Sequence, residues 1–263
     1  MKTNIALLTT VANFELYEKS APLFPQNIQK YVIDGTNGMH ALESVKYMFK
    51  KLKNKNIEWL IMADEDVIFS NPNAVFEIIE HMKSHDYTVC GVRDGGMIPH
   101  RKQNPYLINT FFSIIHFSEI DKMWNEKEVV KNQYIQEAEF DDDISNLIHE
   151  YNTSSIYEPY YCFYLWLRRK KRKFLFLEAT VPFIDDEITN EVKDHNGNTL
   201  LYHTWYARAY GVNEKHTKRI DKVFNTLSIE NQGFIKPVVF KDGTFALRKR
   251  LRKFIAKVVA KIK

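Results

Sequence analysis

The sequence is poor in the residues that cross-link secreted proteins and in the long apolar runs that span membranes. Only two cysteines occur among 263 residues, Cys90 and Cys162, without CxxC spacing. This usage favours a reducing, cytosolic setting. No apolar run approaches the roughly 20 residues that a membrane-spanning helix needs. The N-terminal apolar stretch is interrupted by two threonines, and no A-x-A cleavage pattern follows it. We therefore expect residues 4–12 to form a first strand rather than a signal peptide.

Acidic residues are absent from the last twenty positions, which contain eight Lys and Arg. The whole chain carries +4, which leaves −4 for residues 1–243, so no nucleic-acid-binding face is expected on the body. The tail has apolar residues at helical spacing, namely Leu247, Leu251, Phe254, Ile255, Val258, Val259 and Ile262. A helix of this kind suits an anionic membrane surface, where each basic residue contributes about 1 kcal/mol. Docking on the negatively charged body is the alternative.

Strand-like and helix-like patterns alternate in the first part of the chain. Apolar segments typical of buried strands occupy 4–12, 31–34, 57–69 and 87–92. Residues 39–55 show helical spacing, and 70–85 indicate a helix with Ser70 or Asn71 as its cap and Pro72 in its first turn. This alternation predicts an α/β fold with a mostly parallel sheet flanked by helices.

The second half of the chain is less regular. We expect one or two strands at 107–117 and a short helix at 140–151. Residues 158–183 indicate an aromatic helix, a basic turn and a strand. With no internal repeat and no low-complexity linker, the expected organisation is one domain at 1–243 followed by a basic amphipathic helix at 244–263.

The segment "WLIMADEDVIFSNP" (59–72) places three acids directly after an apolar run. Carboxylates are seldom buried unless they are paired or hold a metal ion, and ligands of parallel sheets bind at the carboxyl ends of strands. Asp64 and Asp66, one residue apart, can share Mn²⁺ or Mg²⁺, which commonly bridges to substrate phosphates. The alternative is a solvated strand end, with Asp66 capping the turn. Asp34 also follows a strand, although it fits an ordinary Asp-Gly turn as well.

In the order "YVIDG", "GMHALESVKYMFKKL" and "LIMADED", these pieces resemble the GT-A family of nucleotide-sugar-dependent glycosyltransferases, in particular the type that builds bacterial surface glycans. The resemblance covers roughly residues 4–92, with weaker similarity to about residue 211. It implies a GT-A-like, Rossmann-like sheet in which Thr9, Thr10 and Asp34 line the nucleotide's base and ribose. Asp64 would approach the ribose or the metal, and Asp66 would bind Mn²⁺ or Mg²⁺ directly.

The resemblance also implies residues from the second half of the site. His203, in "YHTWYARAYG", matches a third metal ligand, although a histidine packed among aromatic residues is the alternative. Inverting members need a general base at the start of a helix, where Glu158 stands here, but Pro159 replaces the usual aspartate. Asp143 of the "FDDD" run is the competing base. Glu158 also suits a helix N-terminal acid, and a retaining mechanism needs no such base.

These expectations describe a glycosyltransferase that moves a sugar from a nucleotide-diphosphate sugar to a glycan, with a lipid-linked glycan as the natural acceptor. Such an enzyme would be cytoplasmic, peripheral on the inner face of the cell membrane, and would serve surface polysaccharide or lipopolysaccharide assembly. A haloacid-dehalogenase-like phosphatase is one alternative, but its DxD lies on the first strand, and here Ile68 replaces its threonine. A sugar nucleotidyltransferase would need a glycine-rich loop near the N-terminus. A non-catalytic membrane adaptor leaves the acids unexplained.

Overall fold

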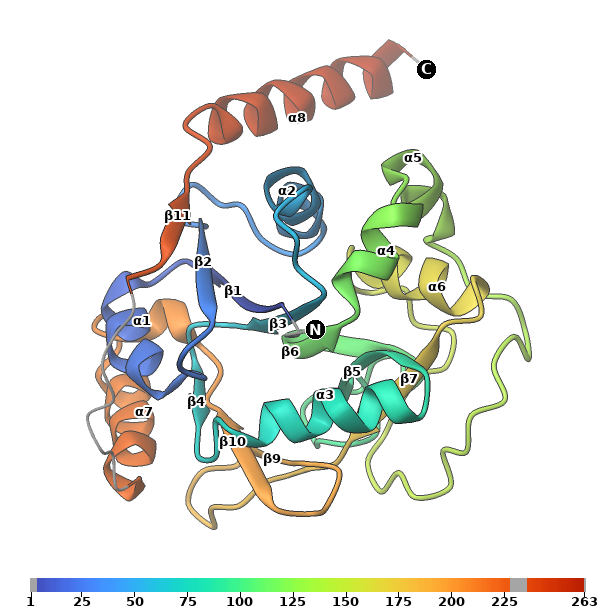
Figure 1. Ribbon diagram of the computed structural model, residues 1–263. Helices are drawn as coiled ribbons and strands as arrows, with labels where there is room; N and C mark the ends of the chain where they lie inside the picture. The colour runs from blue at the N-terminus through green and yellow to red at the C-terminus, as the bar shows by residue number, and fades with distance from the viewer. Residues whose placement is uncertain (1–3, 228–235, 263) are drawn as a thin grey trace.

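The computed structural model describes residues 4–227 and 236–262. At its centre lies a seven-stranded sheet with the order β11-β2-β1-β3-β6-β5-β7 (Figure 1). The strands are β1 (Ile5–Val11), β2 (Gln29–Asp34), β3 (Trp59–Ala63), β5 (Tyr87–Arg93), β6 (Ile108–Ile115), β7 (Lys173–Leu177) and β11 (Val238–Phe240). Every pairing in this sheet is parallel except those of β6 with β3 and β5. The expected mostly parallel α/β sheet is therefore confirmed.

Helices cover both faces of this sheet (Figure 1). One face packs against α2 (Leu42–Leu52), α4 (Phe117–Met123), α5 (Glu126–Val129) and α6 (Tyr161–Arg169). The other face packs against α3 (Ala74–Ser84) and a second, smaller sheet. The remaining helices are α1 (Phe14–Ser20), α7 (Glu214–Thr226), α8 (Phe245–Ile262) and the short 3-10 turns η1 (Ala21–Leu23), η2 (Val130–Asn132) and η3 (Ala207–Ala209). Elements packed on both sides explain why the central strands are largely apolar.

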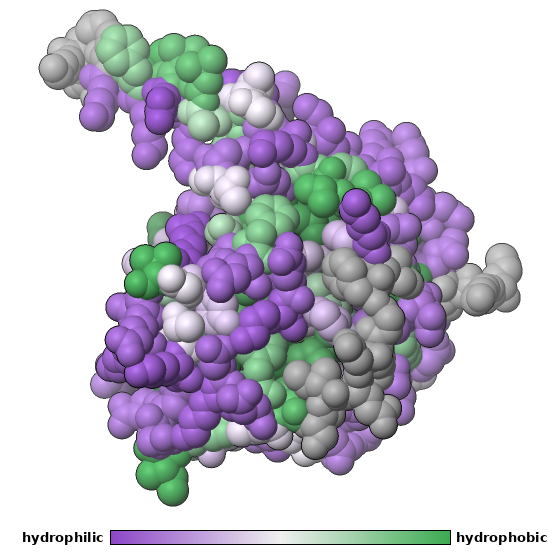
Figure 2. Space-filling model, turned by 90° about the vertical axis from the view of Figure 1, so that its left-hand side faces the viewer, coloured by the Kyte–Doolittle hydropathy of each residue, from purple (hydrophilic) through white to green (hydrophobic). Residues whose placement is uncertain are grey.

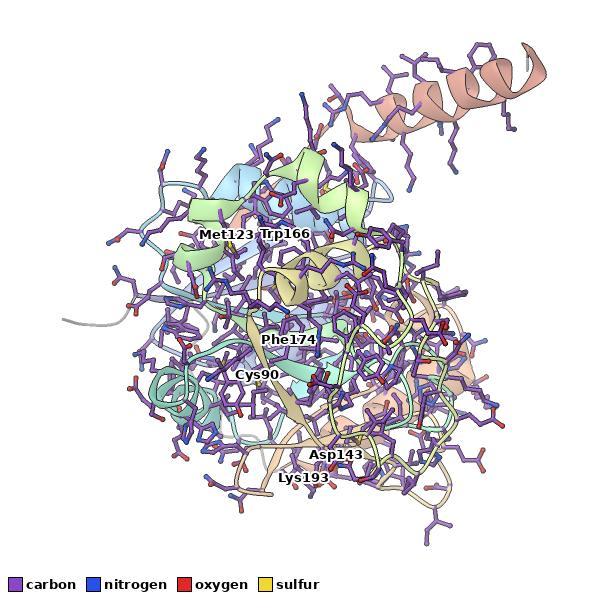
Figure 3. All side chains as sticks on the ribbon, turned by 90° about the vertical axis from the view of Figure 1, so that its right-hand side faces the viewer. Cys90, Met123, Asp143, Trp166, Phe174 and Lys193 are labelled. Atoms are coloured by element: carbon purple, nitrogen blue, oxygen red, sulfur yellow. The ribbon has the colours of Figure 1, made fainter. Side chains whose placement is uncertain are left out.

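The helical layer is built largely from aromatic residues. The α6 side chains from Tyr161 to Leu167 are all buried, because this helix lies between the sheet and the α4–α5 segment. Trp124 stacks on Phe49 of α2 with ring centroids 3.9 Å apart. Figure 3 shows Trp166 in this layer and Cys90 in the sheet below it. Both cysteines of the chain are unpaired and buried, and burial raises the pKa of the Cys162 thiol to about 11.

The smaller sheet begins directly after the acidic motif. Its strands are β4 (Val67–Phe69), β10 (Thr199–His203), β9 (Asn190–Lys193) and β8 (Ala179–Thr180), all paired antiparallel in that order. The single strand expected at 57–69 is therefore two strands in two sheets, β3 and β4, and the three acids occupy the turn between them. Because Val67 pairs with His203, this turn brings the motif and the C-terminal half of the domain together.

Two local expectations are wrong. Helix α3 begins at Ala74 with Asn73 at its N-cap, so neither Ser70 nor Asn71 is the cap, and Pro72 precedes the helix. The amides of Ser70 and Asn71 instead donate to the Leu200 carbonyl, both at 3.0 Å, which keeps this segment attached to β10.

The second incorrect expectation concerns residues 140–151, which form no helix. Acids in and before this segment pair with the arginines at the end of α6, Asp142 with Arg168 and Glu139 with Arg169. These ion pairs hold the segment against the body as an irregular loop, and they do not depend on helical spacing.

Lys30 of β2 is fully buried, and its amine donates to Gln26 Oε1 at 3.0 Å. Burial lowers the pKa of Lys30 from 10.5 to about 8, so the folded state binds this proton more weakly than the unfolded state. We expect Lys30→Met to raise the free energy of unfolding at pH 7 by about 1–3 kcal/mol. In the native protein, this group's contribution should increase as the pH rises from about 8 to 10.5.

Urea unfolding of both proteins over this pH range measures the effect of Lys30. The exposed Lys215→Met variant on α7 is the matched control and should leave stability unchanged within about 0.5 kcal/mol. A Lys30→Met protein less stable than the native one at pH 7 would show that the buried amine stabilises the fold.

Candidate functional site

A pocket of about 530 Å³ opens at the carboxyl ends of β1 and β3. Its walls come from residues 8–12, 39–45 and 62–66, from Thr110 and from residues 206–209. The central sheet provides its floor. The loop before α2 and the segment after β10 contribute to its walls. This is the edge of the sheet at which ligands of parallel α/β folds bind.

All three acids of the motif line this pocket. The Asp64 amide donates to the Phe111 carbonyl at 2.8 Å, and the Val67 amide donates to the Asp64 carbonyl at 3.1 Å, which fixes the turn. Burial raises the pKa of Asp64 well above its usual range, and the charges of Asp66 and Glu65 raise it further. Three neighbouring carboxylates in a sheltered site create a strong negative field, which favours a bound cation.

Glu65 supports the site through the backbone. Its Oε1 accepts hydrogen bonds from the Ala12 and Asn13 amides, at 2.8 and 3.1 Å. Asn13 Nδ2 in turn donates to the Ala207 and Tyr210 carbonyls, both at 2.9 Å. Burial raises the pKa of Glu65 to about 7, and the charge of Asp66 adds to this effect. The middle residue of the motif therefore connects the end of β1 to the 207–210 segment.

His203, which the resemblance implies as a third metal ligand, lies beside Asp66. Its Nε2 is 3.4 Å from Asp66 Oδ1, and the side chain is almost fully buried. The ring stacks on Phe111 with centroids 4.0 Å apart and contacts Trp205 at 4.3 Å. The backbone is also fixed, because Thr204 donates from its amide and its hydroxyl to the Asp66 carbonyl.

The donor atoms at this point fit a divalent cation in part. Two ligands at right angles on an octahedral ion, each about 2.1 Å from it, lie about 3 Å apart. The separation of 3.4 Å between Asp66 Oδ1 and His203 Nε2 is close to that value. Within 4–227 and 236–262, however, no group of three or more His, Cys, Asp or Glu side chains has the arrangement of a complete metal site. Substrate phosphates and water complete many sites of this kind.

Arg208 was not identified from the sequence, yet it lines the pocket and acts electrostatically on Asp64 and His40. Its guanidinium forms no ion pair with another side chain in the described part of the chain. Trp205 and Tyr206, just before it, both have left-handed backbone angles, with φ of 57° and 61°. Such angles cost non-glycine residues about 1–3 kcal/mol each and are concentrated at functional sites. The only signal in the sequence was a basic residue soon after His203.

The three residues expected to line the base and ribose lie in different places. Thr10 lines the pocket. Thr9 is fully buried and lies outside the lining, because successive side chains of a strand point to opposite faces. Asp34 also lies outside the lining. Its Oδ1 accepts from the Thr36 amide at 3.1 Å, and its Oδ2 is 3.0 Å from Lys241 Nζ.

Neither candidate base lines the pocket. Glu158 Oε1 accepts a hydrogen bond from Arg101 at 2.9 Å, just before α6. Arg101 also makes two hydrogen bonds of 2.7 Å to Asp94, a fully buried carboxylate at the end of β5. Asp143 is exposed, and its Oδ1 accepts from the Ser145 amide at 2.9 Å. Figure 3 shows Asp143 in the irregular loop region, away from the layer that holds Trp166.

Asp94 is a second residue that sequence reasoning missed. Besides Arg101, it accepts hydrogen bonds from Asn109 Nδ2 and from the hydroxyls of Tyr160 and Tyr161. Its partners lie up to 67 residues away in sequence, so nothing in the local pattern of the "RDGG" turn indicates them. This buried carboxylate fixes the position of Arg101, which lies 5.7 Å from the ring of Trp205.

No protein-family model matches the chain, and no curated protein matches its sequence. Several solved structures are similar in part, including the following three. The A197 protein of STIV is 11% identical over 76% of this chain and 94% of its own, with a TM-score of 0.38. A glycosyltransferase involved in glycosylation of the major capsid of PBCV-1 is 14% identical over 66% and 81%, with a TM-score of 0.37. The mannosyltransferase PcManGT from Pyrobaculum calidifontis, in complex with GDP-Man and Mn²⁺, is 6% identical over 47% of each chain, with a TM-score of 0.30. Likenesses this weak do not define an activity.

Proposed function

We propose that this chain is a metal-dependent glycosyltransferase whose donor is a nucleotide-diphosphate sugar. The observation that carries the proposal is a pocket of about 530 Å³ whose lining combines acids at a strand end with a cation that acts electrostatically on one of them. Asp64 and Asp66 come from the end of β3, His203 lies 3.4 Å from Asp66, and Arg208 comes from the segment after β10. The volume falls within the range of small-molecule sites.

The residues of the pocket divide into two groups by charge. Asp64, Asp66 and His203 would hold Mn²⁺ or Mg²⁺, which when bound supplies Lewis-acid stabilisation of a departing diphosphate. Arg208 supplies a second positive charge that is in place before the sugar–phosphate bond breaks. A charge fixed in advance stabilises the transition state without reorganisation. Thr10, on the floor of the pocket, would contact the nucleoside.

For an inverting reaction, we propose Glu158 rather than Asp143 as the general base. Arg101, itself held by the buried Asp94, fixes one oxygen of the Glu158 carboxylate. The other oxygen accepts no hydrogen bond from the described residues and is available to an acceptor hydroxyl. Asp143, in contrast, uses a carboxylate oxygen to close an exposed turn.

The proposed acceptor is a lipid-linked glycan of bacterial surface polysaccharide or lipopolysaccharide assembly, reached at the cytoplasmic face of the membrane. Support comes from α8, which extends away from the body in Figure 1. Figure 2 shows hydrophobic residues together on this projecting helix. Four apolar side chains of this helix are more than half exposed, namely Leu247, Leu251, Phe254 and Ile255. The side chains at 258, 259 and 262 are outside the part of the helix whose side chains are described. None of the described helices has the length and apolar character to cross a bilayer.

Calorimetric titration tests the proposed donor class. UDP, GDP and dTDP are titrated into the protein with Mn²⁺ and again with EDTA, with CMP as the control that lacks a diphosphate. We expect one diphosphate to bind in Mn²⁺ and to bind at least about tenfold more weakly in EDTA, because the metal bridges the phosphates to the acids. The absence of binding by any of them in either buffer would contradict the glycosyltransferase proposal.

A further inference from the structure

The loop between β2 and α2 forms one wall of the pocket through Met39, His40 and Ala41. This loop is held from outside by residues that follow β2 by some two hundred positions. Lys241 pairs with Asp34 at 3.0 Å, and Asn37 Nδ2 donates to the Asp242 carbonyl at 2.9 Å. The backbone of β11 adds parallel pairing along β2. The C-terminal segment therefore supports one wall of the pocket, although none of its described residues lines the pocket.

Helix α8 makes the contact nearest to the pocket wall. Lys249 Nζ donates to the Gly38 carbonyl at 2.8 Å, one residue before Met39. Arg252, one turn further on, pairs with Glu43 in the first turn of α2 at 3.3 Å. Phe245, at the start of α8, is buried in the main core. The first two turns of α8 are thus docked on the loop and on α2.

The wall needs this outside support because its own geometry is strained. Ala41, at the N-cap of α2, has φ 52° and ψ −133°, a region that residues other than glycine rarely adopt. Among the described residues, no side chain caps this end of the helix. Strained angles of this kind cost about 1–3 kcal/mol and persist only where surrounding contacts hold them. Lys249 and Arg252 provide such contacts on both sides of Ala41.

The two faces of α8 have different partners. Phe245, Lys249 and Arg252 follow at intervals of four and three, so they share the face that contacts the body. Leu247, Leu251 and Phe254 follow at the same intervals, offset by two residues, which places each of them about 160° round the helix from its counterpart among the body contacts. They are 70, 57 and 65% exposed. A surface bound to the apolar face would leave the body contacts intact.

We infer that α8 acts as a brace for the pocket wall when it is bound to an anionic membrane. Lipid bound to the apolar face of α8 keeps the other face of the helix in contact with the wall. Lys249 is then a positioning residue for His40 and Ala41. Charge favours anionic lipid as the partner of α8, because residues 244–263 carry eight cations and no acid. The inference rests on the membrane association proposed above, but its test needs no nucleotide.

A coupling of this kind must act in both directions. If lipid steadies the wall that a donor contacts, a bound donor raises the affinity for lipid by the same factor. The strained loop is the element whose equilibrium both sites influence. Weaker support of the wall in the absence of lipid would also disfavour donor binding away from the acceptor.

Hydrogen exchange of the amides at 35–41, followed by mass spectrometry, tests the brace. The full chain is compared alone, with vesicles of phosphatidylcholine, and with vesicles that also contain phosphatidylglycerol. We expect exchange to slow by about tenfold with the vesicles that contain phosphatidylglycerol, and to stay unchanged with vesicles of phosphatidylcholine only. Lys249→Ala should abolish this slowing while the protein still sediments with the vesicles. Lys253→Ala removes the same charge from an exposed position of α8 and should retain the slowing.

The possible results distinguish a failure of the brace from a failure of the membrane association on which it rests. Sedimentation with unchanged exchange at 35–41, or equal behaviour of the two lysine variants, would overturn the brace. If Phe254→Glu left sedimentation intact, or if the lipid-free chain formed dimers through α8, the assignment of the apolar face to lipid would be wrong. Because calorimetry tests the nucleotide separately, a failed brace and a failed donor proposal give different patterns.

Discussion

Replacement of Asp66 by asparagine is expected to lower the turnover number by about 1,000-fold, which corresponds to about 4 kcal/mol of lost transition-state stabilisation. The side chain would keep its shape beside His203, but the neutral amide is a poor ligand for a hard cation. The loss should appear with either Mn²⁺ or Mg²⁺. Turnover is measured with the nucleotide sugar whose nucleotide binds by calorimetry.

The same substitution should not destabilise the metal-free protein. The charge of Asp66 raises the pKa of both Asp64 and Glu65, so its removal relieves repulsion among three neighbouring carboxylates. We expect the free energy of unfolding at neutral pH to rise by about 1 kcal/mol. Asp185→Asn, at an exposed ion pair with Lys222, is the control and should change neither quantity. An inactive Asp66→Asn protein that also unfolds more easily would point to a structural role instead.

Arg208→Ala should reduce turnover by about 100- to 1,000-fold, the usual cost of removing one preorganised charge or donor from a transition state. Two effects act together. The guanidinium would no longer face the departing diphosphate, and the pKa of Asp64, which Arg208 lowers, would rise further and weaken the metal site.

Arg208→Lys separates charge from shape at this position. It should recover part of the activity, because it keeps the charge but loses the planar fork that binds phosphate through two hydrogen bonds. The free energy of unfolding of each Arg208 variant measures how much this side chain contributes to the fold. Because the side chain is exposed, we expect a change within about 0.5 kcal/mol. Full activity in Arg208→Ala would remove this residue from the proposed site.

Local pattern predicted much of the fold up to residue 92. Strands β1, β2, β3 and β5 and helices α2 and α3 were expected because their apolar residues repeat with the period of a strand or a helix. Helix α1 was missed because seven residues contain too few repeats to define a period. The division of 57–69 into β3 and β4 was missed because both halves are apolar. The direction of β6 depends on distant pairing, which no local pattern encodes.

The candidate site was predictable only where chemistry coincides with a strand end. Asp66 and His203 lie side by side because β4, which follows the motif, pairs with the end of β10, and Asp64 lines the same pocket from the end of β3. Arg208 depends on two left-handed residues in a row, and non-glycine residues give no sequence signal for that conformation. The support that Lys249 gives to Gly38 spans 211 positions, so it becomes visible only in three dimensions.

Glu65 links parts of the chain that lie far apart in sequence. Its carboxylate holds the Ala12 and Asn13 amides, and Asn13 holds the segment that carries Arg208. The wall at 39–45 contributes side chains to the pocket, whereas Glu65 acts through backbone amides. Because Glu65 accepts from the backbone of residue 13, the two positions have separate roles: Glu65 holds the end of β1, and the Asn13 side chain holds the Ala207 and Tyr210 carbonyls. We therefore expect substitutions that alter the choice of donor to be tolerated better at 39–45 than at Glu65.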